Sequence, residues 1–221
     1  ASNTLVIFFS DNGPWLAKGE GGGLPSPLTG GKGSTREGGE RVPCIMRWPG
    51  KIPPHTVCHE LAVEFDIMPT VAKICGAQMP TDRIIDGKDI SDLMFAKKDA
   101  KTPHQYFYYY NGNRLAGVRS GPWKLRVPTT VGEDFGGYLR LSDPTMLLPR
   151  ALYNLTFDPQ EQKSVLEDHP DVAEKLQAMI EVARADLGDE RRKMVGKNVR
   201  PIGHVDRPLP TKNFGSTKGV Q

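Results

Sequence analysis

Residues 5–9 form a continuous apolar run with no polar alternation. A strand that is buried on both faces of a parallel sheet has this pattern. We therefore expect residues 5–9 to form a parallel-sheet strand, and residues 44–48 to form a second sheet strand that ends at Pro49 and Gly50. Open α/β sheets place their ligands just beyond the carboxyl ends of their strands. The residues that follow position 9 are therefore candidates for a functional site.

A helical repeat appears in the middle of the chain. Its apolar residues recur at i, i+4, i+7 and i+8 and predict one buried face, made by Ile67, Val71, Ile74 and Cys75. Asp66 precedes the repeat and is expected to be the helix N-cap. Cys75 would then be a packing residue of the core.

From residue 105 the pattern changes to short strands rich in aromatic and β-branched residues. These strands would form a small antiparallel sheet from residues 106–110, 114–119, 123–127 and 151–155. Residues 133–149 read as a long loop. A helix is predicted after Asp168 and His169, with Pro170 near its first turn and Gly188 after its last. We expect this helix to pack on the small sheet.

The chain therefore divides into three parts. Residues 1–104 are assigned to an α/β catalytic domain and residues 105–188 to a small subdomain with an antiparallel sheet and a helix. Residues 189–221 are polar, basic and rich in proline and glycine, and they read as a solvated extension that lies on the domain, with an electrostatic arm for an acidic partner as the alternative.

Composition adds bounds to this picture. The 221 residues are 25% charged and 38% hydrophobic, which is typical of a globular protein. A net charge of +3 is too small to indicate a nucleic-acid or membrane partner. No apolar stretch approaches the ~20 residues of a membrane span. Three cysteines do not make a disulfide framework.

Asp11 and Asn12 directly follow the first predicted strand. They offer a carboxylate and an amide carbonyl, and calcium prefers oxygen ligands of this kind. The alternative is that Asn12 and Gly13 form a hairpin turn, although no returning strand follows at once. Since calcium takes about 6–8 oxygen ligands, most of any metal site must lie elsewhere.

A glycine-rich segment surrounds Lys32. It is not a phosphate-binding P-loop, because Gly33 and not a serine or threonine follows Lys32. Glycines let a backbone approach a ligand closely, and a lysine among them offers a compact positive charge to sulfate or phosphate. Ser34 or Thr35 could cap a short helix that carries Glu37. The alternative is a flexible surface loop with one solvated lysine.

Together these motifs closely resemble the sulfatase (arylsulfatase) family of the alkaline-phosphatase-like superfamily. The resemblance runs in order over about residues 4–188, through segments 10–14, 27–33, 37–43, 47–53, 66–70, 85–90, 118–125 and 152–159. It implies an α/β fold: the C-terminal part of an alkaline-phosphatase-like sandwich of parallel-sheet strands with helices, plus a small antiparallel sheet packed on a C-terminal helix.

The resemblance also implies roles for individual residues. Asp11 and Asn12 would bind calcium. Lys32 would be catalytic and would contact a sulfate oxygen or the leaving-group oxygen. His104 opens the first strand of the small sheet, at the mouth of the family's active site, and is a candidate substrate contact.

The family's nucleophile is absent from the chain. It is a formylglycine made from the first residue of a Cys/Ser-x-Pro/Ala-x-Arg motif. Cys44, Cys58 and Cys75 lack these surroundings. We therefore expect the formylglycine in an N-terminal half of the same protein, and no turnover from this chain alone.

The resemblance then implies a sulfuric ester hydrolase acting on a sulfated small molecule or carbohydrate, in a periplasmic, secreted or lysosomal compartment. Two alternatives stay open. One is a phosphonate monoesterase or phosphodiesterase of the same superfamily. The other is a truncated, non-catalytic binding module.

Overall fold

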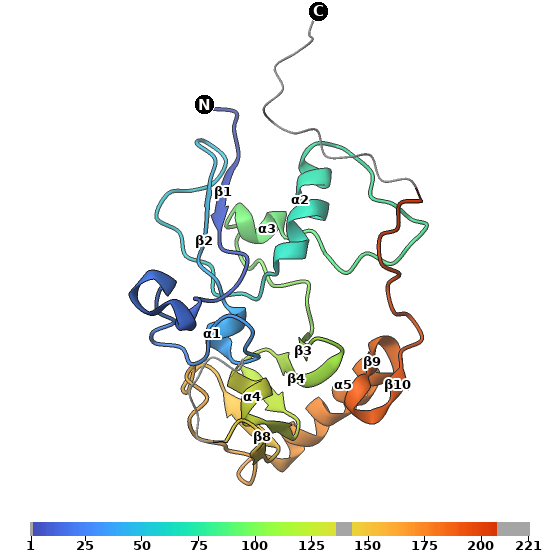
Figure 1. Ribbon diagram of the computed structural model, residues 1–221. Coiled ribbons are helices and arrows are strands. Elements are labelled where there is room, and N and C mark those ends of the chain that lie inside the picture. Colours follow the sequence, from blue (N-terminus) through green and yellow to red (C-terminus); the bar gives the residue numbers. More distant parts are fainter. Residues whose placement is uncertain (1, 136–142, 207–221) are drawn as a thin grey trace, which may run out of the picture.

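The structure is a computed structural model, and it describes residues 2–135 and 143–206. Its elements form two groups (Figure 1), the first of which holds β1 (Val6–Phe9), β2 (Cys44–Arg47), α2 (Ile67–Ile74) and α3 (Ser91–Met94). The second group holds the short helix α1 (Glu37–Glu40), a four-stranded sheet and the long helix α5 (Pro170–Leu187). Over the described ranges, none of the helices has the length and hydrophobicity needed to cross a membrane.

The first strand is present, but its predicted parallel pairing is wrong. β1 pairs antiparallel with β2, with Val6 opposite Arg47 and Phe9 opposite Cys44. All sheets in the described parts of the chain are antiparallel. Phe8 is 63% exposed, so the apolar run is not buried on both faces either. A run of apolar residues predicts a strand with a surface to bury, but it does not predict whether the strand pairs in a parallel or an antiparallel direction.

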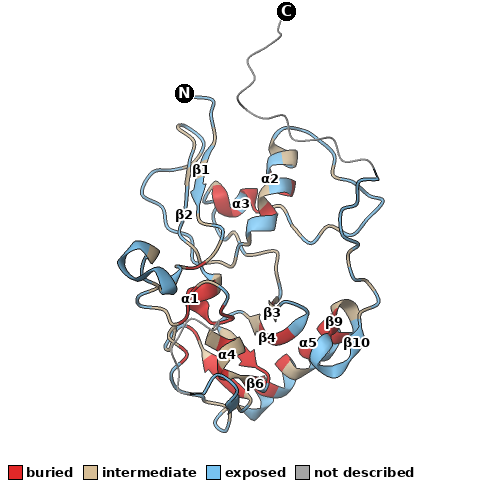
Figure 2. Ribbon diagram, in the orientation of Figure 1, coloured by how far each residue is buried: buried red, intermediate tan, exposed pale blue. Residues whose placement is uncertain are grey.

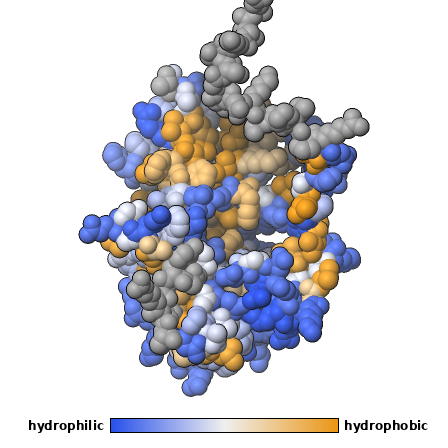
Figure 3. Space-filling view, in the orientation of Figure 1, coloured by the Kyte–Doolittle hydropathy of each residue, from blue (hydrophilic) through white to orange (hydrophobic). Residues whose placement is uncertain are grey.

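The predicted buried face of α2 is also wrong. Val71 is 37% exposed and Cys75 is exposed, whereas Pro69 and Thr70 are the buried residues of the helix. The apolar face instead lines an open groove of about 780 Å³. The groove is lined by Phe9, Glu64, Phe65, Ile67, Met68, Val71, Ala72, Cys75 and Ala77. Figure 3 shows hydrophobic surface gathered over this upper part of the molecule.

The small antiparallel sheet is confirmed. Its strands are ordered β3 (Phe107–Asn111), β4 (Arg114–Ser120), β5 (Trp123–Arg126) and β8 (Ala151–Asn154). The predicted helix is α5, with Pro170 in its first turn and Gly188 at its C-cap in a left-handed conformation (φ 88°). Leu115, Leu125 and Ile180 are completely buried between the sheet and α5. Figure 2 shows that burial concentrates in this lower group.

The predicted long loop contains structure at both described ends. The helix α4 (Val131–Phe135) follows β6 (Thr129–Thr130), and β6 pairs with β7 (Leu147–Leu148). Residues 136–142 lie outside the described residues.

The start of the predicted extension lies on the domain and has regular structure. β9 (Gly188–Asp189), the 3₁₀ turn η3 (Glu190–Arg192) and β10 (Met194–Val195) fold back on α5. Asp189 is 1% exposed and pairs with Arg184 at 3.0 Å, which anchors this segment. Residues 207–221 of the predicted extension lie outside the described residues.

Candidate active site

Asp11 and Asn12 lie immediately after β1, where the sequence places them. Asp11 is exposed and Asn12 is half-buried. The chain then approaches α1 closely, because the Gly13 amide donates to the Gly39 carbonyl at 3.0 Å. A Cβ at Gly13 would lie 2.1 Å from the Gly38 oxygen, so only glycine fits there. The turn is therefore a docking point against α1 and not a tight hairpin.

Lys32 is held beside this turn. Its backbone amide donates to the Pro14 carbonyl at 2.9 Å, and a Cβ at Gly31 would lie 2.6 Å from the same oxygen. The two motifs are thus neighbours in space. The Lys32 ammonium lies 5.4 Å from the centroid of the Trp15 ring. Within the described residues, this ammonium makes no hydrogen bond or ion pair with a side chain.

The short helix α1 carries Glu37 into the protein interior. Glu37 is completely buried and accepts hydrogen bonds from Tyr109 Oη at 2.7 Å and Lys124 Nζ at 3.1 Å. Burial raises the pKa of Glu37, but Lys124, Tyr109 and Arg119 outweigh that effect and hold its pKa below the ordinary value. Glu37 is therefore a buried carboxylate that fixes α1 to the sheet.

Lys124 completes this network from β5. It is 2% exposed, and its ammonium pairs with Glu161 Oε1 at 2.9 Å and donates to the Thr35 carbonyl at 2.8 Å. Burial opposes its charge, but attraction by Glu161 and Glu37 outweighs that effect, so the pKa of Lys124 is raised. Sequence reasoning missed this network, although a lysine between two large apolar residues of a predicted strand was a signal that could have found it.

A second buried pair supports the same segment. Arg36 is 7% exposed and pairs with Asp134 at 2.7 Å, and Arg126 pairs with the same carboxylate at 3.0 Å. The Arg36 guanidinium also lies 4.1 Å from the Phe135 ring centroid. Ser34 donates to the Asp134 carbonyl at 2.6 Å and does not cap α1, whose N-cap is Arg36.

His104 lies apart from Asp11 and Lys32. Its side chain is 7% exposed, and Nε2 lies 2.8 Å from both carboxylate oxygens of Asp66. Asp66 also accepts from the amides of Val63 and Lys88, each at 2.8 Å. Asp66 does occupy the N-cap position of α2, but its side chain does not cap the helix. Over the described part of the chain, no hydrogen bond or ion pair joins His104 to Lys32 or Asp11.

The oxygen donors after β1 fit part of a calcium site. Asp11 makes no ion pair within the described residues, and its charge together with burial raises the pKa of Glu64. A free carboxylate that repels a second carboxylate has the electrostatics of a cation site. The described residues nevertheless hold no group of three or more His, Cys, Asp or Glu side chains suited to a metal. A complete coordination shell would need ligands from elsewhere.

Comparison with known proteins identifies the family of the chain. Residues 32–186 match the family described as N-sulphoglucosamine sulphohydrolase, C-terminal. A steryl-sulfatase of Mus musculus is 35% identical over 206 residues, which cover 84% of this chain and 33% of the relative. Arylsulfatase A of Bos taurus is 37% identical over 187 residues, which cover 80% of this chain and 36% of the relative. The chain thus spans about a third of the length of these two relatives.

Solved structures agree as well. The PsFucS1 sulfatase from Pseudoalteromonas sp. superposes with a TM-score of 0.70 at 29% identity. This match covers 83% of the present chain and 37% of the PsFucS1 chain. A Bacteroides thetaiotaomicron protein of glycosaminoglycan metabolism, BT33336S-sulf, superposes with a TM-score of 0.65 at 27% identity, over 83% of the present chain and 39% of its own.

Proposed function

The chain belongs to the sulfatase family, and we propose that it supplies the C-terminal part of an active site that hydrolyses sulfate esters. One observation carries this proposal. The Gly13–Gly39 and Lys32–Pro14 backbone hydrogen bonds hold a free carboxylate, an amide and a free ammonium on one junction. A cation site and an anion site side by side suit an ester whose sulfate is already negatively charged and whose leaving-group oxygen gains negative charge as the ester bond breaks.

Lys32 acts on the substrate in this proposal. Its ammonium contacts a sulfate oxygen or the leaving-group oxygen and stabilises the charge that grows as the ester bond breaks. Because its backbone is fixed by the Pro14 carbonyl, the charge is positioned before the substrate arrives.

Asp11 and Asn12 contribute two ligands to a calcium site. When bound, calcium supplies positive charge that offsets the charge of the sulfate. The exposed position of Asp11 leaves its carboxylate available for this role.

His104 is a weaker candidate for a substrate contact. Its Nε2 is engaged by Asp66, so contact with a substrate would use the other ring nitrogen. The observed pair supports a positioning role for His104 at least as well, because it ties the start of the small sheet to α2.

The nucleophile belongs to an N-terminal part of the protein in this proposal. All three cysteines are free and exposed, and none lies in the family's nucleophile motif. The uncovered apolar face of β1 and α2 supports an N-terminal partner segment, because an exposed patch of this kind is typical of a surface that another segment covers.

Sulfated carbohydrates are the substrate class that we propose, since one relative is an N-acetylgalactosamine-6-sulfatase.

The decisive experiment begins with the coding DNA upstream of Ala1. We expect a continuous reading frame with a Cys/Ser-x-Pro/Ala-x-Arg motif, and we expect the complete protein to hydrolyse an aryl sulfate when calcium is supplied. A complete protein that cleaves aryl phosphonates but not aryl sulfates would overturn the proposal in favour of a phosphonate monoesterase.

A further inference from the structure

The ammonium groups of Lys18 and Lys32 both lie near the indole ring of Trp15. Lys18 Nζ lies 4.7 Å from the ring centroid and Lys32 Nζ lies 5.4 Å from it. The two nitrogens therefore lie no more than about 10 Å apart, a separation that two anionic groups of one sugar can span. The indole itself is 42% exposed, so a large aromatic surface faces solvent beside them.

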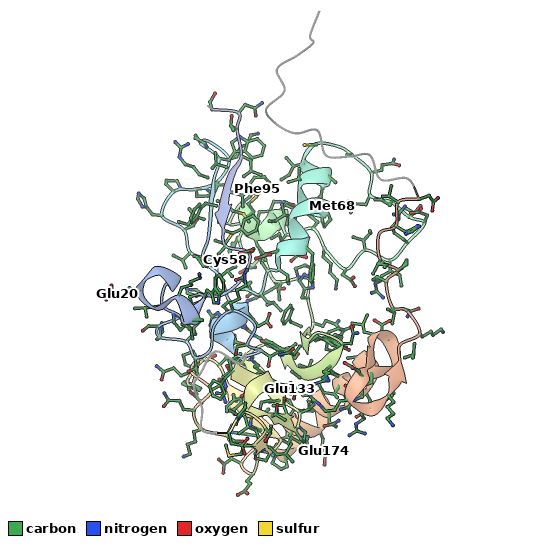
Figure 4. The ribbon with its side chains drawn as sticks, in the orientation of Figure 1. Glu20, Cys58, Met68, Phe95, Glu133 and Glu174 are labelled. Atoms are coloured by element: carbon green, nitrogen blue, oxygen red, sulfur yellow. The ribbon has the colours of Figure 1, made fainter. Side chains whose placement is uncertain are left out.

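Neither ammonium is neutralised by a carboxylate in the parts of the chain that are described. The acidic residue of the same segment, Glu20, lies at its outer edge (Figure 4). Two like charges near one ring repel each other, and anionic groups bound to them would relieve that repulsion. The arrangement therefore has the charge of an anion subsite.

Backbone hydrogen bonds fix the relative positions of the segments that carry Trp15, Lys18 and Lys32. Trp15 and Lys18 lie at the start of the 3₁₀ segment η1 (Leu16–Gly22), which closes through the hydrogen bond from the Trp15 amide to the Gly22 carbonyl at 3.0 Å. A Cβ at Gly22 would lie 1.9 Å from the Trp15 oxygen, so the closure requires glycine. The Lys32 amide then fastens the glycine-rich segment to Pro14, the neighbour of Trp15.

We propose that Trp15 and Lys18 form a substrate subsite beside Lys32, which selects sulfate esters of sugars that carry a second anionic group, a sulfate or a carboxylate. Trp15 packs on the apolar face of the ring that bears the ester. Lys18 pairs with the second anionic group, while Lys32 meets the scissile sulfate. The role of Lys32 rests on the proposed function, whereas the roles of Trp15 and Lys18 are additional to it.

The test measures binding to the 221-residue chain by NMR, with the indole Nε1–H signal of Trp15 as the reporter. The probes are N-acetylglucosamine 6-sulfate and glucosamine 2-N,6-O-disulfate, which differ by one anionic group because the acetamide is neutral, at about 0.15 M salt to screen non-specific attraction. We expect the disulfated probe to bind about three- to five-fold more tightly, the range of one partly exposed ion pair. Lys18→Gln should remove this difference, because it weakens binding of the disulfated probe more than binding of the monosulfated probe.

Lys51→Gln is the matched control. It removes the same charge from an exposed turn after β2, and the register of β1 and β2 places that turn at the opposite end of the ribbon from Asp11. This control should leave the preference intact. In Trp15→Ala both probes should bind more weakly, now followed on the Lys32 amide signal, while the indole signals of Trp48 and Trp123 report that the fold is kept.

Three results would overturn the subsite: equal binding of the two probes, no shift of the Trp15 signal at tens of millimolar, or equal effects of Lys18→Gln and Lys51→Gln. None of these measurements depends on turnover. Failure of the subsite is thereby distinguishable from failure of the proposed function, which is judged by sulfate-ester hydrolysis in the complete protein.

Discussion

Lys124 Nζ lies 3.1 Å from Glu37 Oε1, and both side chains are almost completely excluded from solvent. Glu37 belongs to α1, beside the Lys32 segment, and Lys124 belongs to β5 of the small sheet. The pair therefore joins the candidate active site to the part of the chain with the best-formed core.

Lys124→Met should destabilise the chain strongly. It leaves Glu37 and Glu161 buried without their cation, and removal of one partner from a buried ion pair costs about 3–5 kcal/mol. Urea unfolding followed by circular dichroism would measure the change. Lys175→Met is the control, because Lys175 forms only an exposed pair with Asp171 on α5. A Lys124→Met midpoint equal to that of the parent would contradict the role assigned to the network.

Glu40→Gln should stabilise the chain at high pH only. Burial raises the pKa of Glu40 from 4.5 to about 7, with the charge of Lys124 opposing and that of Glu37 reinforcing the shift. Below about pH 4.5 the carboxyl is protonated in both folded and unfolded chains, so it has no effect there. As the pH rises from 4.5 through 7, the folded state loses stability because Glu40 must ionise where its charge is disfavoured.

The measurement for Glu40 is the melting temperature of parent and Glu40→Gln at pH 5, 6, 7 and 8. The advantage of the variant should grow with pH and level off above about 7. Glu37→Gln should instead be destabilising by a similar amount at all four pH values, because the lowered pKa of Glu37 gives stability that is fully present above its unfolded pKa of 4.5 and is lost only on acidification below it. An advantage of Glu40→Gln that is the same at pH 5 and pH 8 would refute the raised pKa.

Val71→Ser should separate the isolated chain from the complete protein. Val71 is 37% exposed, so we expect a stability change within about ±0.5 kcal/mol in the chain alone. In the complete protein the same variant should cost more, because an N-terminal segment would cover this face of α2. Ile180→Ala is the comparison, since its fully buried side chain should cost about 2–5 kcal/mol in both contexts. Equal costs of Val71→Ser in both contexts would argue that nothing covers α2.

Asp11→Ala and Lys32→Ala should have different effects on metal content in the complete enzyme. Asp11→Ala should lose both calcium and activity. Lys32→Ala should keep calcium and lose about 10²–10³ in rate, the cost of one preorganised transition-state contact. Metal analysis and aryl-sulfate turnover on the same samples would decide the matter. Full activity in Lys32→Ala would reduce Lys32 to a solvated loop residue.

The 221-residue chain alone should bind calcium weakly and turn over no sulfate ester. Two oxygen ligands make up a minor part of a shell of about 6–8, and a lysine cannot replace a covalent nucleophile. Calorimetry and an aryl-sulfate assay would test the two statements. Turnover that survives the triple variant Cys44→Ala, Cys58→Ala and Cys75→Ala would show that the chemistry lies elsewhere in the chain.

The sequence predicted the local elements of the small sheet well, because each strand and turn there is set by short-range patterns. β4 and β5 meet at Gly121, as the turn signal requires. The pairing of β1 and the burial of α2 were wrong for one shared reason. Both segments carry apolar surfaces that stay exposed in the described parts of the chain, and a pattern of apolar residues indicates neither the direction of a strand nor what covers a surface.

The candidate site was predicted only in part. The roles of Asp11 and Lys32 came from the family resemblance and stay predictions, and the structure brings the backbones of their two segments together at Gly13, Pro14 and Gly31. The buried network around Glu37 was missed, because Lys124, Glu161 and Asp134 lie far from it in sequence and meet only through tertiary packing.

The junction at Gly13 and Gly31 separates two kinds of change. It pins both ends of the segment between residues 14 and 31 by backbone contacts that depend little on the side chains within the segment. The outer part of that segment, residues 15–24, can therefore change while Asp11 and Lys32 keep their positions, whereas Thr29 and Gly30 also contact Gly38 of α1. In a protein of this design, substitutions in one short loop can change which sulfate ester is bound, while the residues proposed for catalysis and metal binding stay in place.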